Sequence, residues 1–301
     1  MPELIKEITK LKDEKNAVIL VHNYQRPEIY QVADYIGDSL GLARKAAETD
    51  KDVIVFCGVH FMAETAKILS PEKTVLLPAQ DAGCPMADMV TVEDVNKLRE
   101  QYSTAAVACY VNTTAAVKAA SDVCVTSSNA VDVINSLDQK QVIFVPDKNL
   151  AAYVAQFSDK EIILFNGYCN VHERFSAEYL IAAKEQHPNA AVVVHPECKP
   201  EVTELADHVC STSKMIDFAR QTDAVDILVG TEMGMIERLR IEVPEKNFYS
   251  AGGVKACPNM KKTTLELVYS ALLNNQYQIE VQNQIAEKAR LSLERMLAVK
   301  G

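Results

Sequence analysis

Short apolar runs alternate with helical segments along the whole chain. A typical run, Ala-Val-Ile-Leu-Val at residues 17–21, is about as long as a strand that is buried on both faces of a sheet. The intervening segments carry apolar residues at helical spacing, as in residues 1–15, where Leu4, Ile8 and Leu11 fall on one face. This alternation predicts parallel sheets covered by helices, and therefore an α/β fold.

Three of the strand-like stretches, residues 16–25, 104–113 and 189–198, are similar to one another. Without gaps they align two polar positions near the strand ends. The first aligned position holds His22, Tyr110 and His195, and the second holds Tyr24, Asn112 and Glu197. The interval from one copy to the next is nearly constant, so the copies indicate a threefold internal repeat.

A second strand is expected in each repeat after an aspartate, in stretches that begin at Asp52, Asp122 and Asp207. In the second and third repeats the aspartate follows the first aligned position at the same short distance. In the first repeat the distance is more than twice as long. On this alignment, only the first repeat carries an insertion.

One cysteine of each repeat lies just past a further strand, in a turn that is rich in Gly, Pro or Asn. The three are Cys84, Cys169 and Cys257, and each follows the first aligned position of its repeat at almost the same distance along the chain. Equivalent placement in all three repeats is hard to attribute to chance. In parallel sheets the ligand site lies outside the carboxyl ends of the strands. We therefore expect the cysteines and the aligned polar residues to face one central cavity.

The repeat predicts three similar three-layer αβα domains with short parallel sheets, related by pseudo-threefold symmetry around that central site. Their expected limits are residues 1–88, 89–172 and 173–262. Two helices, about 263–273 and 283–299, should follow and pack on the first domain. Thr263 with Glu266 has the form of a capping box, and Asn283 is a candidate cap for the last helix.

Composition narrows the class of protein. A formal net charge of −10 argues against binding to nucleic acid, which requires a basic surface. No apolar run approaches the roughly 18 residues of a membrane helix, and the N-terminus is amphipathic, unlike a signal peptide. We expect a soluble cytoplasmic protein with no membrane partner. The length of 301 residues is typical of two or three domains.

The chain has eight cysteines and no C-x-x-C motif, so any metal site must draw on distant segments. Three converging thiolates suit Zn²⁺ with a fourth ligand or a [4Fe–4S] cluster with one open iron, and single cysteines from three domains favour the cluster. Four cysteines inside strand patterns are expected in the core: Cys57, Cys109, Cys124 and Cys210. The role of Cys198 is left open between a wall of the site and a turn residue.

Short polar turns precede helical runs at 126–129 and 211–213 and, in the first repeat, at 37–39. Such junctions present backbone N–H groups and hydroxyls to phosphate or carboxylate, so Ser39, Ser127, Ser211 and Thr212 are candidates for an anion pocket. Helix capping alone is the alternative for any one turn. His60, His172, His187 and His208 are expected to be surface residues or locally satisfied.

These features resemble the quinolinate synthase family. The similarity spans residues 5–297 and rests on eight motifs, of which Gly58-Val-His-Phe-Met-Ala-Glu-Thr-Ala-Lys67 is the most specific. The others are His22-Asn-Tyr-Gln25, Ala33-Asp-Tyr-Ile-Gly-Asp-Ser39, Tyr110-Val-Asn112, Val125-Thr-Ser-Ser-Asn-Ala130, Pro146-Asp-Lys-Asn-Leu150, His195-Pro-Glu-Cys198 and Thr231-Glu-Met-Gly-Met235.

The resemblance implies a [4Fe–4S] enzyme that condenses iminoaspartate with dihydroxyacetone phosphate to quinolinate, releasing phosphate and two waters. It implies cluster ligation by Cys84, Cys169 and Cys257, and transient contact with the enzyme that supplies iminoaspartate. Implied substrate-binding residues are His22, Ser39, Tyr110, Asn112, Ser127, His195, Glu197, Ser211 and Thr212. Candidates for proton transfer are Tyr24, Tyr110, His195 and Glu197.

Some longer family members carry C-x-x-C-x-x-C near the third cysteine, whereas this chain reads Ala256-Cys-Pro-Asn-Met260 there, so disulfide regulation does not transfer. Two other functions remain open from the residues themselves. One is a metal-sensing regulator that binds a metabolite without turnover, which the absence of a DNA-binding segment or basic face disfavours. The other is a cluster-dependent hydro-lyase that acts on a hydroxy acid.

Overall fold

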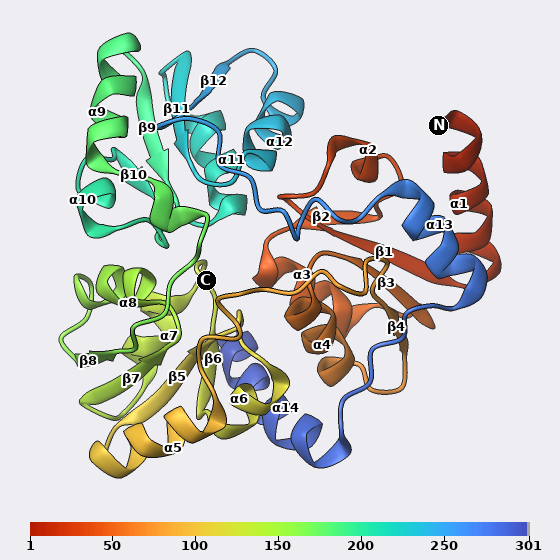
Figure 1. The fold of residues 1–301 in the computed structure, drawn as a ribbon, viewed down its shortest axis with the longest axis horizontal. Coiled ribbons are helices and arrows are strands. Elements are labelled where there is room, and N and C mark those ends of the chain that lie inside the picture. Colours follow the sequence, from red (N-terminus) through yellow and green to blue (C-terminus); the bar gives the residue numbers. More distant parts are fainter. Residues whose placement is uncertain (300–301) are drawn as a thin grey trace.

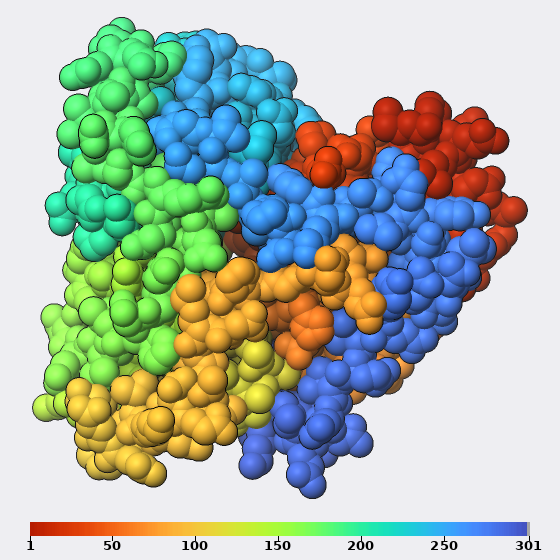
Figure 2. Space-filling view, in the orientation of Figure 1, coloured from red at the N-terminus to blue at the C-terminus, as the bar shows by residue number. Residues whose placement is uncertain are grey.

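The computed structural model describes residues 1–299, and the chain forms three lobes around a common centre (Figure 1). We call the lobes the first, second and third unit, in chain order. Segments of all three units meet near the middle of the molecule (Figure 2).

The elements follow the same sequence in each unit. The first unit contains α1 (Pro2–Glu14), β1 (Ala17–His22), α2 (Pro27–Tyr30), β2 (Tyr35–Gly37), α3 (Ser39–Glu48), β3 (Val53–Cys57), α4 (His60–Leu69) and β4 (Thr74–Leu76). The second contains α5 (Val92–Gln101), β5 (Ala106–Tyr110), α6 (Ala115–Ala120), β6 (Val123–Val125), α7 (Ala130–Ser136), β7 (Gln141–Val145), α8 (Lys148–Ala155) and β8 (Glu161–Leu164). The third contains a 3₁₀ turn (His172–Arg174), α9 (Ala177–Gln186), β9 (Ala191–Val194), α10 (Pro200–Thr203), β10 (His208–Val209), α11 (Thr212–Gln221), β11 (Asp226–Gly230), α12 (Gly234–Glu242) and β12 (Asn247–Ser250). Two helices, α13 (Leu265–Asn274) and α14 (Asn283–Ala298), complete the chain that the structure describes.

Each unit has one four-stranded sheet, and the strand orders are β2-β1-β3-β4, β6-β5-β7-β8 and β10-β9-β11-β12. All pairs within these sheets are parallel. The prediction of an α/β fold with three similar domains and short parallel sheets is confirmed. The residue limits of the three domains stay a prediction.

The first sheet shows why these residues form buried strands. Successive side chains point to opposite faces, so Ile19 and Val21 pack towards α1 and α13, whereas Leu20, Ile54 and Phe56 belong to the core on the other face. A strand covered on both faces needs an uninterrupted apolar run, which is the pattern in the sequence.

Among the described residues no helix is long and apolar enough to cross a bilayer.

The prediction of an insertion in the first unit is wrong. The second strand of this unit is β2, preceded by Asp34, and the stretch after Asp52 is instead the third strand, β3. At three half-buried or buried residues, β2 is too short to give a clear apolar signal.

The true equivalents are Asp34, Asp122 and Asp207. Each follows the first aligned position of its unit at one and the same distance along the chain. The carboxylate of each also accepts a backbone N–H from the neighbouring strand; the three donors are Ile19, Val107 and Val192. The three units are therefore in register here without an insertion.

The two C-terminal helices pack differently from one another. α13 lies against α1 on the first unit, whereas α14 packs mainly against α6 and β6 of the second unit and also against α4. The expectation that both lie on the first unit is therefore corrected for α14, whose buried Ala289, Leu293 and Met296 form the face between the two units.

The expected helix caps also differ. The Thr264 hydroxyl, not that of Thr263, accepts the Leu267 N–H at the start of α13. α14 begins after Gln282 without a side-chain cap, so Asn283 does not cap it.

Candidate functional site

A cavity of about 350 Å³ is lined by residues of all three units. The parallel strands place their carboxyl ends towards it, which is where α/β sheets bind ligands. Twelve of the thirteen site residues expected from the sequence line it: His22, Tyr24, Ser39, Cys84, Tyr110, Asn112, Ser127, Cys169, His195, Glu197, Thr212 and Cys257. The buried side-chain oxygen Oδ1 of Asn112 has no hydrogen-bond partner within residues 1–299.

The remaining residue, Ser211, is buried and is not among the residues that line the cavity. Its hydroxyl lies 2.7 Å from that of Ser128, and both hydroxyls are within hydrogen-bond distance of the Asp38 carboxylate, at 3.2 and 2.6 Å. These three residues come from three different units. Ser211 therefore joins the units beside the cavity.

Ser39, Ser127 and Thr212 occupy one repeat position, because each follows the first aligned position of its unit at the same distance along the chain. Ser39 and Thr212 are the first residues of α3 and α11, and Ser127 lies shortly before α7. Hydroxyls at such strand–helix junctions can bind an anion together with the free backbone N–H groups. The repeat thus brings three hydroxyl groups to one cavity.

His22 and His195 are equivalent in geometry as well as in sequence. The Nδ1 atom of each ring accepts the backbone N–H two residues later, from Tyr24 at 3.1 Å and from Glu197 at 3.3 Å. Burial lowers the pKa of His22 to about 4 and that of His195 to about 3. Both rings are therefore neutral near pH 7 and carry their proton on Nε2, which can donate to an anionic ligand.

Glu197 lies in direct contact with His172. The Nδ1 atom of His172 is 2.6 Å from Oε2 of Glu197, although the contact is not aligned as a hydrogen bond, and Nε2 of His172 lies 2.8 Å from the Thr231 hydroxyl. Burial alone would raise the pKa of Glu197, but the neighbouring His172 and His195 rings and the Tyr110 hydroxyl lower it overall. Glu197 is therefore a buried carboxylate at neutral pH.

His172 is a site residue that the sequence pattern did not indicate. It is 1% exposed and lines the cavity, so a surface role is excluded. The signal was its position three residues after Cys169. Glu232 was missed as well, although it lies in a motif that the sequence analysis quoted; it is fully buried and also lines the cavity.

Tyr24 and Tyr110 are the two tyrosines of the cavity. The Tyr24 hydroxyl lies 2.6 Å from the Thr231 hydroxyl, and its ring packs edge-on against His22. Burial, reinforced by the charge of Glu197, raises the pKa of both phenols well above 10. They are protonated at neutral pH and can serve as hydrogen-bond or proton donors.

The three turn cysteines are free thiols that share one local geometry. Burial raises the pKa of each thiol, and the backbone N–H groups of the second and third residues after the cysteine act in the opposite direction, as those of Val171 and His172 do for Cys169. Burial dominates at Cys84, where it raises the pKa of the thiol to about 12. A bound cation would offset the burial effect, because a coordinating thiol is deprotonated.

Cys169, His172 and Glu197 place one ligating atom each within 4.8 Å of one another, so they could hold a metal ion. Within residues 1–299 no other set of His, Cys, Asp and Glu meets this criterion, and the three turn cysteines are thus spread more widely around the cavity. Ligands to different corners of one cluster need not be close together, whereas the ligands of a single ion must be.

The other cysteines do not line the cavity. Cys57, Cys109, Cys124 and Cys210 are buried, as expected for core residues. Cys198 is also buried, and its thiol donates to the Gly230 carbonyl at 3.3 Å.

Comparisons with known proteins were made on the whole chain. The family model described as quinolinate synthetase A protein matches residues 6–298. The quinolinate synthase of Methanoregula boonei is 54% identical over 296 residues, which cover 98% of each chain. The quinolinate synthases of Thermodesulfovibrio yellowstonii and Caldicellulosiruptor saccharolyticus are 53% and 52% identical, with coverage of 98% and 97% of each chain.

Among solved structures, the E-1-hydroxy-2-methyl-but-2-enyl-4-diphosphate reductase of Plasmodium falciparum aligns over 91% of this chain and 94% of its own, with 12% identity. Its TM-score of 0.31 supports no statement about fold or function.

Proposed function

The chain belongs to the quinolinate synthetase A family, and from this membership we propose that it is a quinolinate synthase of NAD biosynthesis. The reaction would condense iminoaspartate with dihydroxyacetone phosphate to give quinolinate, phosphate and two waters. The observation that carries the proposal is the cavity, because it gathers one cysteine and a set of polar residues from each of the three units.

The cysteines fit a [4Fe–4S] cluster in three respects. Cys84, Cys169 and Cys257 are free, they line one cavity, and the backbone N–H groups that follow each cysteine act to lower the pKa of its thiol. We propose that these three residues hold the cluster. When bound in this way, it supplies one iron without a protein ligand, which is a Lewis acid for carboxylate, hydroxyl or nitrogen groups of the substrate.

The neutral histidines and the hydroxyl groups would bind the anionic substrates. His22 and His195 offer their Nε2–H groups, and Ser39, Ser127 and Thr212 offer hydroxyls at helix starts. Phosphate and carboxylates are strong acceptors, so these neutral donors suit them.

Proton transfers would fall to the ionisable groups around Glu197. As a carboxylate at neutral pH, Glu197 can accept a proton during imine condensation or dehydration, and the His172 ring lies in direct contact with it. Tyr24 and Tyr110 remain protonated and can donate to a leaving hydroxyl or a developing oxyanion.

The cytoplasmic location expected from the sequence belongs to this proposal. It is supported by the eight free cysteines, which are typical of a reducing compartment. The proposed small-molecule substrates, and transient contact with the enzyme that supplies iminoaspartate, belong to it too.

The proposal is tested by turnover. Protein reconstituted with iron and sulfide under anaerobic conditions is mixed with oxaloacetate, ammonia and dihydroxyacetone phosphate, and quinolinate is measured by chromatography. We expect quinolinate only when all three substrates are present. Loss of dihydroxyacetone phosphate from the mixture without quinolinate formation would contradict the proposal, as would turnover of a hydroxy acid alone.

A further inference from the structure

One repeat position beside the cysteine turns differs in chemistry among the units. In every unit this position lies two residues after the strand that comes third along the chain, which is β3, β7 or β11. It also lies at the same distance along the chain from His22, Tyr110 and His195, the residues at the first aligned position. The residues there are Val59, Asp147 and Glu232. All three are buried, so two of the units place a carboxyl group where the first has an apolar side chain.

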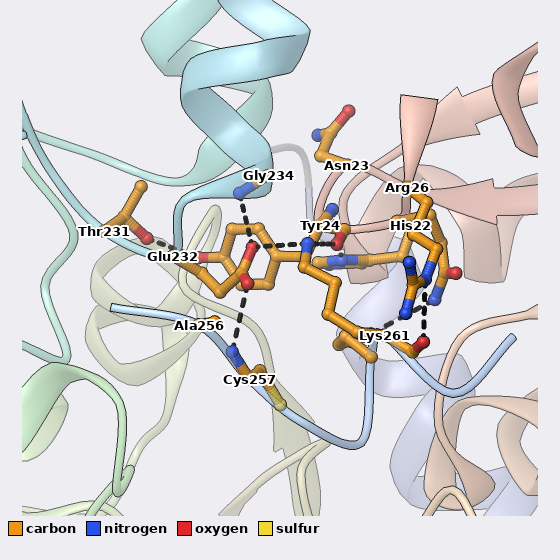
Figure 3. A network of polar contacts seen from close by, with 12 residues as sticks. His22, Asn23, Tyr24, Arg26, Thr231, Glu232, Gly234, Ala256, Cys257 and Lys261 are labelled. Atoms are coloured by element: carbon orange, nitrogen blue, oxygen red, sulfur yellow. Dashed lines mark hydrogen bonds and ion pairs between the residues drawn. The ribbon is translucent and has the colours of Figure 1, made fainter. Parts of the chain in front are cut away.

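Glu232 connects the cysteine turn of the third unit to the helix that follows its third strand (Figure 3). Oε1 accepts the backbone N–H of Cys257 at 3.0 Å, and Oε2 accepts the N–H of Gly234, the first residue of α12, at 2.6 Å. Lys261 donates to the same Oε2 at 3.1 Å and to the backbone carbonyl of Tyr24. Both carboxylate oxygens are thus occupied by separate donors.

Asp147 makes the same pair of contacts in the second unit. Oδ2 accepts the backbone N–H of Cys169 at 3.1 Å, and Oδ1 accepts the N–H of Leu150 in the first turn of α8 at 2.7 Å. A side chain one methylene shorter therefore bridges the cysteine turn and the following helix in the same way.

All three units share one main-chain hydrogen bond beside the cysteine turn, but the first unit lacks the carboxyl group that accompanies this bond in the other two. In each unit the residue just after this position donates its N–H to the carbonyl two residues before the cysteine; the pairs are His60 to Ala82, Lys148 to Gly167 and Met233 to Lys255, at 2.8, 2.9 and 2.9 Å. The first unit has this bond but only Val59 beside it, and Val59 gives α4 no side-chain cap. The backbone N–H of the cysteine is therefore bound by a carboxyl group in the second and third units alone.

We propose that Asp147 and Glu232 are positioning residues that hold the backbone of Cys169 and Cys257 for metal binding, while the turn of Cys84 has no carboxyl group at this position. The inference rests on the proposed assignment of these cysteines as cluster ligands. An amide cannot replace either carboxyl group, because its NH₂ end would face a backbone N–H that needs an acceptor. Groups that orient metal ligands typically contribute about 10–100-fold to metal affinity.

Glu232→Gln and Asp147→Asn test the proposal, with Asp207→Asn as the matched control. Asp207 is an exposed carboxylate of the third unit that also accepts a backbone N–H, from Val192, but it precedes β10 at the opposite end of that strand from the cavity. The reconstituted proteins are exposed to an iron chelator, and the loss of the cluster absorption is followed. We expect loss about 10–100-fold faster in the first two variants and unchanged in the control.

A second perturbation leaves the charge of Glu232 in place. A Cβ on Gly234 would lie 2.6 Å from Lys261 Nζ, 2.7 Å from the Tyr24 carbonyl oxygen and 2.8 Å from Oε2 of Glu232. Gly234→Ala should therefore disturb the Lys261–Glu232 contact, displace the carboxylate and speed up cluster loss as well. The reduction potential of the cluster adds a second readout: Glu232→Gln removes a negative charge and should shift the potential to more positive values, by more than Gly234→Ala, which keeps the charge.

Hydrogen exchange on the metal-free proteins separates this inference from the proposed function. In Glu232→Gln the amides of the turn around Cys257 should exchange faster than in the unmodified chain, with those around Cys84 unchanged. If the unmodified chain binds no cluster, the proposed function fails, and this exchange result alone decides the positioning role. Cluster loss and exchange equal to those of Asp207→Asn in all variants would overturn the inference.

Discussion

Acidification from pH 7 to pH 5 should destabilise the protein through His22 and His195. Burial lowers the pKa of His22 from 6.5 to about 4 and that of His195 to about 3, so both rings are largely neutral in the folded protein at pH 5. In the unfolded chain each ring binds a proton below about pH 6.5. Because the unfolded state then binds more protons, the free energy of unfolding falls as the pH falls through this range.

The magnitude follows from these pKa values. One unit of pH below the unfolded pKa is worth about 1.4 kcal/mol, so a histidine that titrates near 6.5 when unfolded and stays neutral when folded costs about 2 kcal/mol at pH 5. Both rings give nearly the same value, because pH 5 is above the folded pKa of each. Together they amount to roughly 4 kcal/mol, which is a large share of a typical stability of about 5–15 kcal/mol.

The assay is urea unfolding of metal-free protein at pH 7 and pH 5, for the unmodified chain and for His22→Gln. We expect the unmodified chain to lose about 2 kcal/mol more than the variant between the two pH values. His208→Gln, at an exposed histidine, is the control and should behave as the unmodified chain does. Equal pH dependence in His22→Gln and the unmodified chain would refute the reasoning, since it would mean that the folded ring accepts a proton at pH 5.

Two further predictions concern the cavity. Ser127→Ala combined with Thr212→Ala should raise the apparent KM for a substrate several-fold and leave the cluster spectrum intact, as measured by steady-state kinetics; unchanged kinetics would assign these hydroxyls to helix capping alone. Glu197→Gln and Tyr24→Phe should each lower kcat by about 10²–10⁴-fold, because each removes a group to which we assign proton transfer. Both substitutions nearly preserve volume, so a variant that melts far earlier but turns over normally would show that the residue is structural.

The threefold repeat could be predicted because a residue-for-residue alignment needs no knowledge of contacts. Nearly constant spacing is enough to single out Cys84, Cys169 and Cys257. The same alignment is wrong at the second strand of the first unit. There β2 is short, and the longer apolar run of β3 was aligned in its place with the second strands of the other units. A hydrophobic pattern indicates long buried strands more clearly than short ones, and it does not indicate the order of the strands in a sheet.

The residues that could not be predicted from the sequence are those whose roles depend on contacts between distant segments. His172 follows Cys169 closely, but only the fold brings it to Glu197, beyond the end of β9. Glu232 and Asp147 belong to quoted motifs, yet their side chains bond to cysteine backbones that lie much further along the chain. A sequence pattern gives the spacing of such residues but not the hydrogen bonds between them.

Ser211 shows the reverse case. It is a turn residue next to Thr212, and its type and position suit an anion pocket. Its hydroxyl lies instead within hydrogen-bond distance of Asp38 and Ser128, and it does not line the cavity. Which of two adjacent hydroxyls lines the cavity depends on side-chain direction, which spacing alone does not reveal; that Ser211 binds substrate stays a prediction.

The central claim is that the repeat brings one cysteine from each unit to a single iron–sulfur cluster. Iron and sulfide content after anaerobic reconstitution tests it most directly, in the unmodified chain, in Cys169→Ser and in Cys109→Ser, a core cysteine of the second unit. We predict about four iron atoms per chain in the unmodified protein and in Cys109→Ser, with loss of the cluster in Cys169→Ser. Full iron content in Cys169→Ser would contradict the claim.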